Sequence, residues 1–401
     1  MAKGAYLGVG GVAKKGKKAY FGVGGVAKKV KKAYIGVNGV AKLWWSGSVA
    51  LKTLFTPVDT SSTSYMEGDG DIPTTLTSKN LTFVPRNIFY DSKNERFIIV
   101  QYIGSSPVPV YTRPVDGDTW TNCGSFEWQN GGYRNQGDLT MDPDTGDLIF
   151  WERISSTNGR FAKVTVSSSG VTKTTTANRA TSLDYNPIGV KKVKDYYVTT
   201  IQQGSTTVNL LYMTSAFDAI NVGTFAGQKP SSITSMTCQK DNVPVLPMIF
   251  WNGSKYIAYR QSTRSNASHF IQYAQSDSMS FTFSTTGNVK QFSNSSTVNQ
   301  MINTNLDNTD LLFIVKNTNE NVFPSAGTWN FAATKLSSSY PNVTHNSTTT
   351  CNPISDGKRV YFLNNYTTSI YNFVYCNSEY VWTVASLAFP VRPYAYARTI
   401  A

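Results

Sequence analysis

Several features that would assign a chain of 401 residues to a function class are missing from this sequence. It has no run of 18 or more apolar residues, so we expect no membrane span. Lysines and glycines interrupt the first 50 residues, and we therefore expect no signal peptide. Only 15% of the residues are charged, whereas aromatic residues make up 13%. This composition is typical of a folded protein rich in β-strands.

Residues for metal binding and nucleophilic catalysis are scarce. None of the four cysteines lies in a Cys-x-x-Cys or Cys/His pair, so we expect them to be reduced and buried, with no metal site and no cofactor. These cysteines are Cys123, Cys238, Cys351 and Cys376. The two histidines, His269 and His345, lie in contexts that mark no nucleophile, so no catalytic triad is predicted.

Acidic residues are absent from the start of the chain. The first is Asp59, and eleven lysines precede it: Lys3, Lys14, Lys15, Lys17, Lys18, Lys28, Lys29, Lys31, Lys32, Lys42 and Lys52. After Val58 the chain holds 26 basic and 24 acidic residues, so the formal net charge of +13 belongs almost entirely to the N-terminal segment. The high overall charge therefore does not indicate that the large remainder binds nucleic acid.

The same segment contains three copies of a repeat: AYLGVGGVAKKGKK, AYFGVGGVAKKVKK and AYIGVNGVAKLWWS. In the third copy, the aliphatic residues Ala33, Ile35 and Val37 alternate with Tyr34 and Gly36, and this period of two is typical of a β-strand. Asn38-Gly39 follows, and this dipeptide favours a two-residue type I′ turn. Gly10-Gly11 and Gly24-Gly25 occupy the same place in the other copies. The sequence therefore predicts one β-hairpin for each copy.

The lysines of the repeat have no acid nearby to compensate them. Three hypotheses fit: a solvated and disordered tail, a nucleic-acid-binding arm, or a module that docks onto an acidic protein surface. Arginine, which reads phosphates and bases better than lysine, is absent from the segment, and this weakens the second hypothesis. Ordered hairpin faces favour the third. The expected partner-binding residues are Tyr6, Tyr20, Tyr34, Lys14, Lys15, Lys28, Lys29, Lys31, Lys32 and Asn38.

These tandem copies resemble repeats at the N-termini of virion structural proteins from phages and prophages of Gram-positive gut bacteria. The resemblance covers residues 3 to about 46, and its most specific stretch is AYIGVNGVAK, from Ala33 to Lys42. In such proteins an N-terminal module commonly fixes the protein to the particle, and a variable domain follows. The resemblance implies a virion location, other virion proteins as partners, and membership of a larger oligomeric assembly.

A second periodicity, of about 50 residues, begins near residue 80. Six times a polar turn precedes an aliphatic and aromatic run, at intervals of 53, 51, 57, 55 and 49 residues. The turns are marked by Asp91, Asp144, Asp195, Asn252, Asp307 and Asp356. We therefore divide the chain into a basic hairpin anchor (1–55), a linker rich in serine and threonine at its start (56–79) and a repetitive β domain (80–401).

Repeats of this length with several short strands each are typical of β-propeller blades. Runs such as Phe97–Val100 and Leu311–Val315 are continuously apolar, as expected for strands covered on both faces. The sequence therefore predicts an all-β fold, with hairpin repeats followed by a propeller of about six blades; five or seven are alternatives. Turns such as Asp116–Thr121 resemble in part the aspartate boxes of sialidase-like propellers, although the spacing of those boxes is not kept.

No catalytic residue is predicted, although several groups leave alternatives open. Glu152 follows an apolar run, and it would be either a carboxylate in a central channel or an ordinary charge at a strand end. A sialidase-like site would also need arginines that converge, and the candidates are Arg86, Arg153 and Arg260. Glu67–Asp71 and Asp142–Asp147 resemble metal loops, but ordinary polar turns explain both segments better.

The surface chemistry of the large domain suits sugars, because aromatic rings stack on sugar faces and amides pair with hydroxyl groups. Trp128, Tyr133 and Arg134 lie in a segment rich in amides and are the candidate glycan-binding residues; the alternative is a polar loop with one buried tryptophan. We expect a virion protein that adheres to host-surface glycan or decorates the particle. The alternatives are a glycan-degrading tail enzyme on the same propeller and an internal virion protein that contacts nucleic acid.

Overall fold

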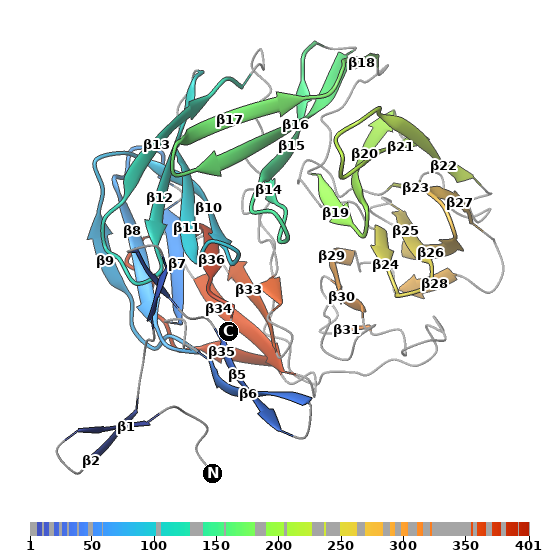
Figure 1. The fold of residues 1–401 in the computed structure, drawn as a ribbon. Helices are drawn as coiled ribbons and strands as arrows, with labels where there is room; N and C mark the ends of the chain where they lie inside the picture. Colours follow the sequence, from blue (N-terminus) through green and yellow to red (C-terminus); the bar gives the residue numbers. More distant parts are fainter. Residues whose placement is uncertain are drawn as a thin grey trace. The chain divides into compact units, whose positions relative to one another are not determined.

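The computed structural model describes residues 51–400 apart from some internal segments, and in the first 50 residues it describes six strands. The segments left out are 58, 102–105, 129–138, 156–157, 181–189, 204–206, 227–235, 238–248, 263–268, 284–288, 293–297, 304–310, 316–320, 323–353, 356–358, 366–370, 378–381 and 392. The regular structure of the described residues is entirely β-strand (Figure 1). This part of the chain therefore contains no helix long and apolar enough to cross a membrane.

The chain divides into two compact units, and the boundary lies between Leu51 and Lys52. The described part of the first unit consists of three antiparallel hairpins, each a separate two-stranded sheet. They pair β1 (Tyr6–Val9) with β2 (Val12–Lys15), β3 (Tyr20–Val23) with β4 (Val26–Lys29), and β5 (Lys32–Val37) with β6 (Val40–Ser46). In each hairpin two residues separate a pair of opposed valines, which agrees with the predicted two-residue turns.

The register of the third hairpin differs from that of the first two. Tyr6 lies opposite Lys15 in the first hairpin, and the equivalent tyrosine and lysine are opposed in the second. In the third, Tyr34 lies opposite Leu43, and the register shifts between Ala33 and Tyr34. The last copy is therefore a variant hairpin and not a third identical unit.

The described residues of the second unit form seven sheets, most of their strands antiparallel. The first sheet in chain order has the strands β10 (Pro85–Asp91), β11 (Arg96–Gln101), β12 (Val108–Pro114) and β13 (Thr121–Phe126). The second has β14 (Thr140–Met141), β15 (Leu148–Arg153), β16 (Asn158–Ser167), β17 (Gly170–Thr175) and β18 (Arg179–Ala180). The third has β19 (Lys191–Val193), β20 (Tyr196–Gln203), β21 (Thr207–Thr214) and β22 (Asn221–Ala226), and β27 (Ser280–Thr282) pairs in parallel with β22.

The next three sheets continue along the chain. The fourth has β23 (Met236–Thr237), β24 (Ile249–Trp251), β25 (Tyr256–Ser262), β26 (His269–Ser276) and β28 (Val289–Phe292). The fifth has β29 (Val298–Asn303), β30 (Leu311–Val315) and β31 (Asn321–Val322). The sixth has β32 (Ile354–Ser355), β33 (Arg359–Asn365), β34 (Tyr371–Asn377) and β35 (Trp382–Ala385). In four of these six sheets, the polar turn found in the sequence, at Asp91, Asp144, Asp195 or Asn252, lies between two paired strands. The turns marked by Asp307 and Asp356 lie outside the described residues.

The seventh sheet, which we call the closing sheet, combines both ends of the second unit. Its order is β36-β7-β8-β9, formed by β36 (Pro393–Arg398), β7 (Lys52–Pro57), β8 (Ser64–Asp69) and β9 (Thr77–Asn80). Of the 24 residues 56–79, which were expected to be a linker, 11 therefore lie in strands of this sheet. The described strands of the second unit form seven sheets, the number that the sequence analysis kept as an alternative to about six. The closing sheet was not counted because it lacks the repeated polar turn that marks the others.

Neighbouring sheets pack face to face through apolar clusters. Strand β15 shows how: Leu148 and Phe150 belong to a cluster shared with the β10–β13 sheet, whereas Ile149 and Trp151 belong to one shared with the β19–β22 sheet. Both faces of the strand are thus buried, and each such side chain contributes about 1.5–3 kcal/mol. The predicted burial of Phe97–Val100 is confirmed, since all four side chains are buried.

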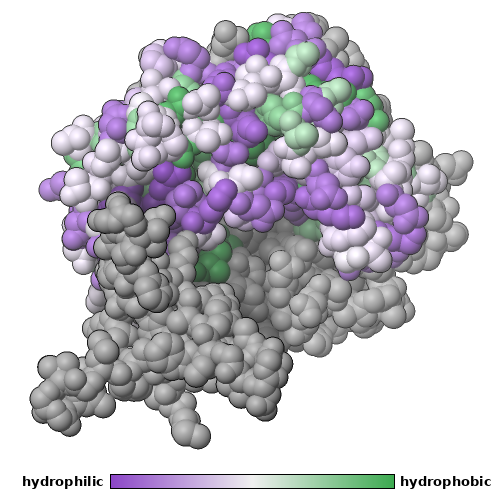
Figure 2. Space-filling model, viewed as in Figure 1, coloured by the Kyte–Doolittle hydropathy of each residue, from purple (hydrophilic) through white to green (hydrophobic). Residues whose placement is uncertain are grey.

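Further clusters continue this succession. The β19–β22 sheet shares one with the sheet of β24–β26, and the closing sheet shares another with the β32–β35 sheet. The closing sheet also bonds to the β10–β13 sheet, because Thr56 Oγ1 donates to the Arg86 carbonyl at 2.7 Å. Successive antiparallel sheets, joined face to face and completed by a sheet from both ends, form a β-propeller. On the face shown in Figure 2, polar residues predominate over the described surface.

Candidate functional site

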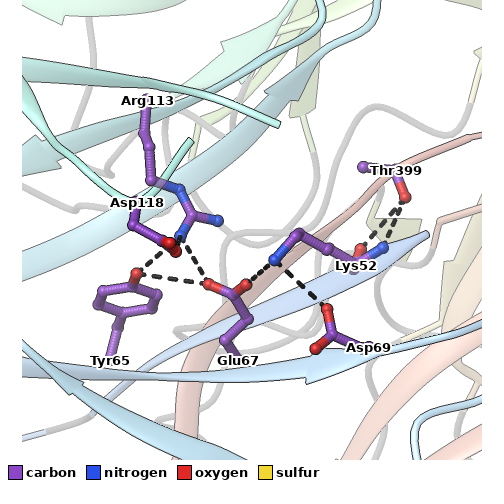
Figure 3. Close-up of polar contacts among 7 residues, drawn as sticks. All are labelled: Lys52, Tyr65, Glu67, Asp69, Arg113, Asp118 and Thr399. Carbon is purple, nitrogen blue, oxygen red and sulfur yellow. Dashed lines mark hydrogen bonds and ion pairs between the residues drawn. The ribbon is translucent and has the colours of Figure 1, made fainter. Parts of the chain in front are cut away.

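Charged residues meet where the closing sheet faces the β10–β13 sheet, and we call this group the Glu67 cluster (Figure 3). Glu67 and Arg113 are buried in it, whereas Asp69 and Asp118 are exposed at its margin. Its members are Lys52, Tyr65, Glu67, Asp69, Arg113, Asp118 and Thr399. Strand β8 places Glu67 between the buried residues Met66 and Gly68. A Cβ atom at Gly68 would lie 2.5 Å from the Cβ of Pro73, so the close packing beside Glu67 requires a glycine.

Glu67 lies between two cations, and its side chain is only 4% exposed. Its Oε2 accepts a hydrogen bond from Nη1 of Arg113 at 2.6 Å, and its Oε1 accepts one from Nζ of Lys52. The same Arg113 nitrogen donates to the hydroxyl of Tyr65 at 2.8 Å. Arg113 belongs to β12 of the next sheet, so this ion pair joins two adjacent sheets inside the protein.

The surroundings keep Glu67 ionised. Burial alone would raise the pKa of its carboxyl group, but hydrogen bonds and charge from Lys52 and Arg113 outweigh burial and hold the pKa below its usual range. Burial likewise would lower the pKa of Lys52, and the bond to Glu67 reverses this and raises it. A carboxylate held in this way cannot take up a proton near neutral pH, so Glu67 is unsuited to general acid–base catalysis.

Aromatic rings surround the guanidinium group of Arg113, which is fully buried. The ring centres of Phe97, Trp120 and Tyr65 lie 5.4, 5.4 and 5.6 Å from its Cζ. Its Nε and Nη2 have no hydrogen-bond partner among the described residues. The rings supply a favourable electrostatic environment for a cation, and Glu67 supplies the compensating charge. These features make the cluster a rigid internal joint between two sheets.

A second ion-pair group ties the closing sheet to its other neighbour. Asp71 Oδ1 accepts a hydrogen bond from Nη2 of Arg398 at 2.8 Å, and Asp71 also pairs with Arg359 of β33. The guanidinium group of Arg398 lies 4.2 Å from the ring centre of Tyr361. The segment Glu67–Asp71 was expected to be a solvated turn; residues 69–71 are exposed, whereas Glu67 and Gly68 are buried in β8. Its first and last acids hold three sheets together.

The other buried carboxylates of the described residues are also paired with cations. Glu152 is fully buried and pairs with Arg160 at 2.7 Å and with Lys173 at 2.5 Å. The carboxylate is therefore not unpaired in a channel: it is a charge near the end of β15, as the alternative held, and it is buried and paired within its sheet. Asp91, which is also buried, pairs with Arg96 at 2.9 Å. Each of these pairs joins strands of one sheet.

The Asp142–Asp147 segment is a hairpin turn between β14 and β15, as the sequence favoured. The Asp142 amide donates to the Asp147 carbonyl, and the Gly146 amide donates to the Asp142 carbonyl, both at 2.8 Å. Burial would raise the pKa of Asp142, but bonds from Tyr197 and Lys192 lower it. Within the described residues, no three histidine, cysteine or acidic side chains come together as metal ligands would.

The candidate glycan-binding residues are not brought together on a described surface. Trp128 is 5% exposed, and its ring packs 4.6 Å from that of Phe150 and 6.0 Å from that of Phe126. Its faces are therefore covered by the core, and the alternative of a buried tryptophan holds. Tyr133 and Arg134 lie outside the described residues.

The arginines suggested for a sialidase-like site are not shown to converge. The Cζ of Arg86 lies 3.4 Å from the ring centre of Tyr394, in the closing sheet. Arg153 and Arg260 are in β15 and β25, and their side chains lie outside the described part. His269 begins β26, as predicted for a strand residue, and His345 lies outside the described residues.

The predicted partner-binding residues fall in the first unit. Most of them lie in its strands: Tyr6 in β1, Lys14 and Lys15 in β2, Tyr20 in β3, Lys28 and Lys29 in β4, and Lys32 and Tyr34 in β5. Lys31 and Asn38 lie outside the described residues. The backbone register brings tyrosine and lysine positions opposite one another in the first two hairpins.

Sequence reasoning missed Glu67, Arg113 and Arg398 as members of internal joints. One signal was present: Arg113 and Arg398 each follow strand residues that are largely apolar, where an unpaired charge would be costly. The signal indicates burial of a charge with a partner. It does not identify the partner, because the partner can be distant in the sequence: Glu67 lies 46 residues before Arg113.

Comparisons with known proteins support the fold. No family model matches the chain, and no curated protein matches it. A putative 6-phosphogluconolactonase from Bacteroides fragilis is similar in structure, with 9% identity, a TM-score of 0.54, and coverage of 88% of this chain and 98% of that one. The periplasmic gluconolactonase of Pseudomonas aeruginosa is similar as well, with 10% identity, a TM-score of 0.51, and coverage of 88% and 100%. At such identities the likeness shows the fold alone: the large unit is a β-propeller.

Proposed function

We propose that the chain is a bacteriophage virion structural protein that attaches to the particle through its N-terminal repeats. The propeller then faces outward, where it adheres to host-surface glycan or decorates the particle. The docking partner is an acidic surface on another virion protein. The expected contacts are made by the lysines and tyrosines of the first unit.

One observation carries this proposal: the structural boundary after Leu51 lies only seven residues before the end of the acid-free segment at Val58. Residues 1–51 hold ten lysines, no arginine and no acid, whereas residues 52–401 hold 27 basic and 24 acidic residues. Lone two-stranded hairpins are marginally stable in water and gain stability from a partner. An acidic partner would both reduce the repulsion among the lysines and cover a face of the hairpins.

The internal chemistry of the propeller favours a binding role over a hydrolytic one. Its described buried carboxylates are Glu67, Asp91, Asp142 and Glu152, and all four pair with lysine or arginine. A glycosidase needs two carboxyl groups aimed at one bond, with one of them kept protonated. The described residues present no such pair of buried carboxyl groups.

Removal of residues 1–46 from the chain tests the proposal in assembling particles. We expect the truncated protein to be lost from purified particles while it keeps the melting temperature of the full chain. Lys14, Lys15, Lys28 and Lys29 changed together to glutamine should reduce incorporation as well. The matched control is Lys93→Gln, which neutralises one exposed lysine of the propeller. Normal incorporation of the truncated protein would contradict the anchor.

The rival functions give different results. Release of reducing ends from host wall polysaccharide by residues 52–401 would favour a glycan-degrading enzyme. Binding of duplex DNA by the full chain that depends steeply on salt, and disappears on removal of residues 1–46, would favour a nucleic-acid-contacting protein. Binding of the propeller to intact host cells without release of sugar is the result that we expect.

A further inference from the structure

We propose that the closing sheet is a joint that carries tension from the N-terminal repeats into the propeller by loading β7 in shear. The inference rests on the proposed function only in that attachment at one end and adhesion at the other would supply the tension. The geometry that carries it belongs to the second unit and is independent of any partner.

Along the chain, the first strand after the repeats is β7, an inner strand of the closing sheet. Lys52 follows the last residue of the first unit and is the first residue of β7. Strand β7 pairs on one side with β36, from Thr53 opposite Arg398 to Pro57 opposite Pro393. On the other side it pairs with β8. A force applied to the repeats therefore reaches a strand that is held along both edges.

The first residue of β7 is also its best-anchored one. The Lys52 amide donates to Oγ1 of Thr399 at 2.9 Å, and the Thr399 amide donates to the Lys52 carbonyl at 3.0 Å. The Lys52 side chain bonds to Glu67 and lies 3.3 Å from Asp69, both on β8. Lys52 is thus bonded to both neighbouring strands at the point where a force would enter (Figure 3).

The strand behind Lys52 is buried, and its neighbours are themselves fixed. Residues 53–56 are wholly buried, so displacement of β7 along its axis would break apolar contacts and both hydrogen-bonded ladders together. Glu67 is held by Arg113 from the next sheet, and Arg398 is held by Asp71, which also binds Arg359. The joint therefore distributes force over three sheets.

The direction of pulling should decide how strongly the joint resists. When the chain is held at its N-terminus and at a distant point of the propeller, the bonds along β7 share the force and must break together. When it is held at its two ends, the force enters β7 and β36 at Lys52 and Thr399, which are bonded to each other. The ladder then opens one pair at a time, which needs a smaller force.

Single-molecule force spectroscopy on the full chain tests this prediction. One handle is placed at residue 1, and the other is placed either at residue 401 or in a tag inserted after Ser168, in the exposed turn between β16 and β17. We expect the force that opens the propeller to be several-fold higher with the internal handle. Equal forces, or a higher force between the two ends, would overturn the proposal.

Two variants locate the resistance. Lys52→Met removes the side-chain bonds to β8 and should lower the opening force with the internal handle. Lys255→Met is the matched control, because it removes an exposed pair with Asp277 in another sheet and should leave that force unchanged. If Lys52→Met fails to fold, Asp69→Asn replaces it and should cause a smaller decrease. No decrease in either variant would contradict the role of Lys52. Because the isolated chain is measured, these results are independent of whether particles need residues 1–46.

Discussion

The protein contains two repeats, and only the longer one builds a core. Both begin from the same element, a β-hairpin with a polar or glycine-rich turn. The short repeat yields separate two-stranded sheets, β1-β2, β3-β4 and β5-β6. The long repeat yields sheets of mostly four or five strands whose long central strands are apolar on both sides. A hairpin becomes part of a stable domain when further strands and a second covered face are added.

The difference in charge follows the difference in burial. The propeller contains nearly equal numbers of acids and bases, and it pairs the acids that it buries, as Glu67 and Glu152 show. The short repeat has lysines without acids, which only a solvated or partnered segment tolerates. Stability should therefore reside in the second unit, and attachment in the first.

Deletions at the two ends of the chain should give the largest difference in stability between the two units. Removal of residues 393–401 takes away β36, so one edge of β7 loses its hydrogen-bonded neighbour, and Asp71 loses Arg398 as an ion-pair partner but keeps Arg359. It also removes Tyr396 from the apolar cluster around Phe55. We expect loss of cooperative unfolding and aggregation of this variant. Removal of residues 1–51 should leave the melting temperature within a few degrees of that of the full chain. Thermal unfolding followed by circular dichroism measures both, and similar damage from the two deletions would contradict the division into units.

The buried ion pair of the closing sheet should give the next largest effect. Glu67→Gln leaves Arg113 and Lys52 without their shared counter-charge, and we expect a loss of about 3–5 kcal/mol in the free energy of unfolding. Asp277→Asn removes an exposed partner of Lys255 and should cost about 0–1 kcal/mol. Denaturant titration measures both values. A cost for Glu67→Gln as small as that for Asp277→Asn would mean that the cluster is not a structural joint.

The sequence allowed most of the propeller to be predicted, and the missing part has a physical cause. Six sheets were found because the sequence of each has polar residues before an apolar run, as at Asp91 and Asn252. The seventh combines residues from both ends, and its pairing of Phe55 with Tyr396 is not a local property. The serines and threonines after Pro57 were interpreted as a linker, although the strands that follow are ordered parts of the sheet.

The site was less predictable than the fold, because its residues act through distant partners. Glu67 looked like part of a polar turn, and only the fold brings Arg113 to it. Glu152 was singled out, but its role depends on Lys173, on another strand of its sheet. Trp128 had the chemistry of a sugar platform, yet contacts with Phe126 and Phe150 cover its ring. Burial of individual side chains was thus the property that the sequence conveyed least well.

Acid should unfold the propeller through the carboxylates that it holds in ion pairs. The pKa values of Glu67 and Asp142 are lowered in the folded protein, so both groups stabilise it above the pKa values of the unfolded chain, about 4. This contribution is lost as the pH falls through the lowered pKa values. We expect the melting temperature to decrease steadily below about pH 5, equally in the full chain and in residues 52–401, because residues 1–51 contain no acid.

The variant Asp142→Asn sharpens this test. It removes one of the titrating groups, so it should lower the melting temperature at pH 7 and make the decrease in acid shallower. Asp195→Asn is the control, since the Asp195 side chain is mostly exposed. A melting temperature that stays constant down to about pH 2 would exclude the ion pairs as the acid-sensitive element.

The smallest effect should come from single turn glycines, which both repeats contain. Gly146 has a φ of +79°, and an added Cβ would lie 2.8 Å from the carboxyl group of Asp91, which holds Arg96. Gly253 has a φ of +96° in open space. We expect Gly253→Ala to cost about 1–2 kcal/mol from backbone strain alone, and Gly146→Ala to cost more. Gly11→Ala, in the short repeat, should leave propeller unfolding unchanged. Denaturant titration measures the loss in the free energy of unfolding for each variant. Equal losses at positions 146 and 253 would mean that Asp91 moves freely. A measurable loss at position 11 would mean that the short repeat stabilises the propeller.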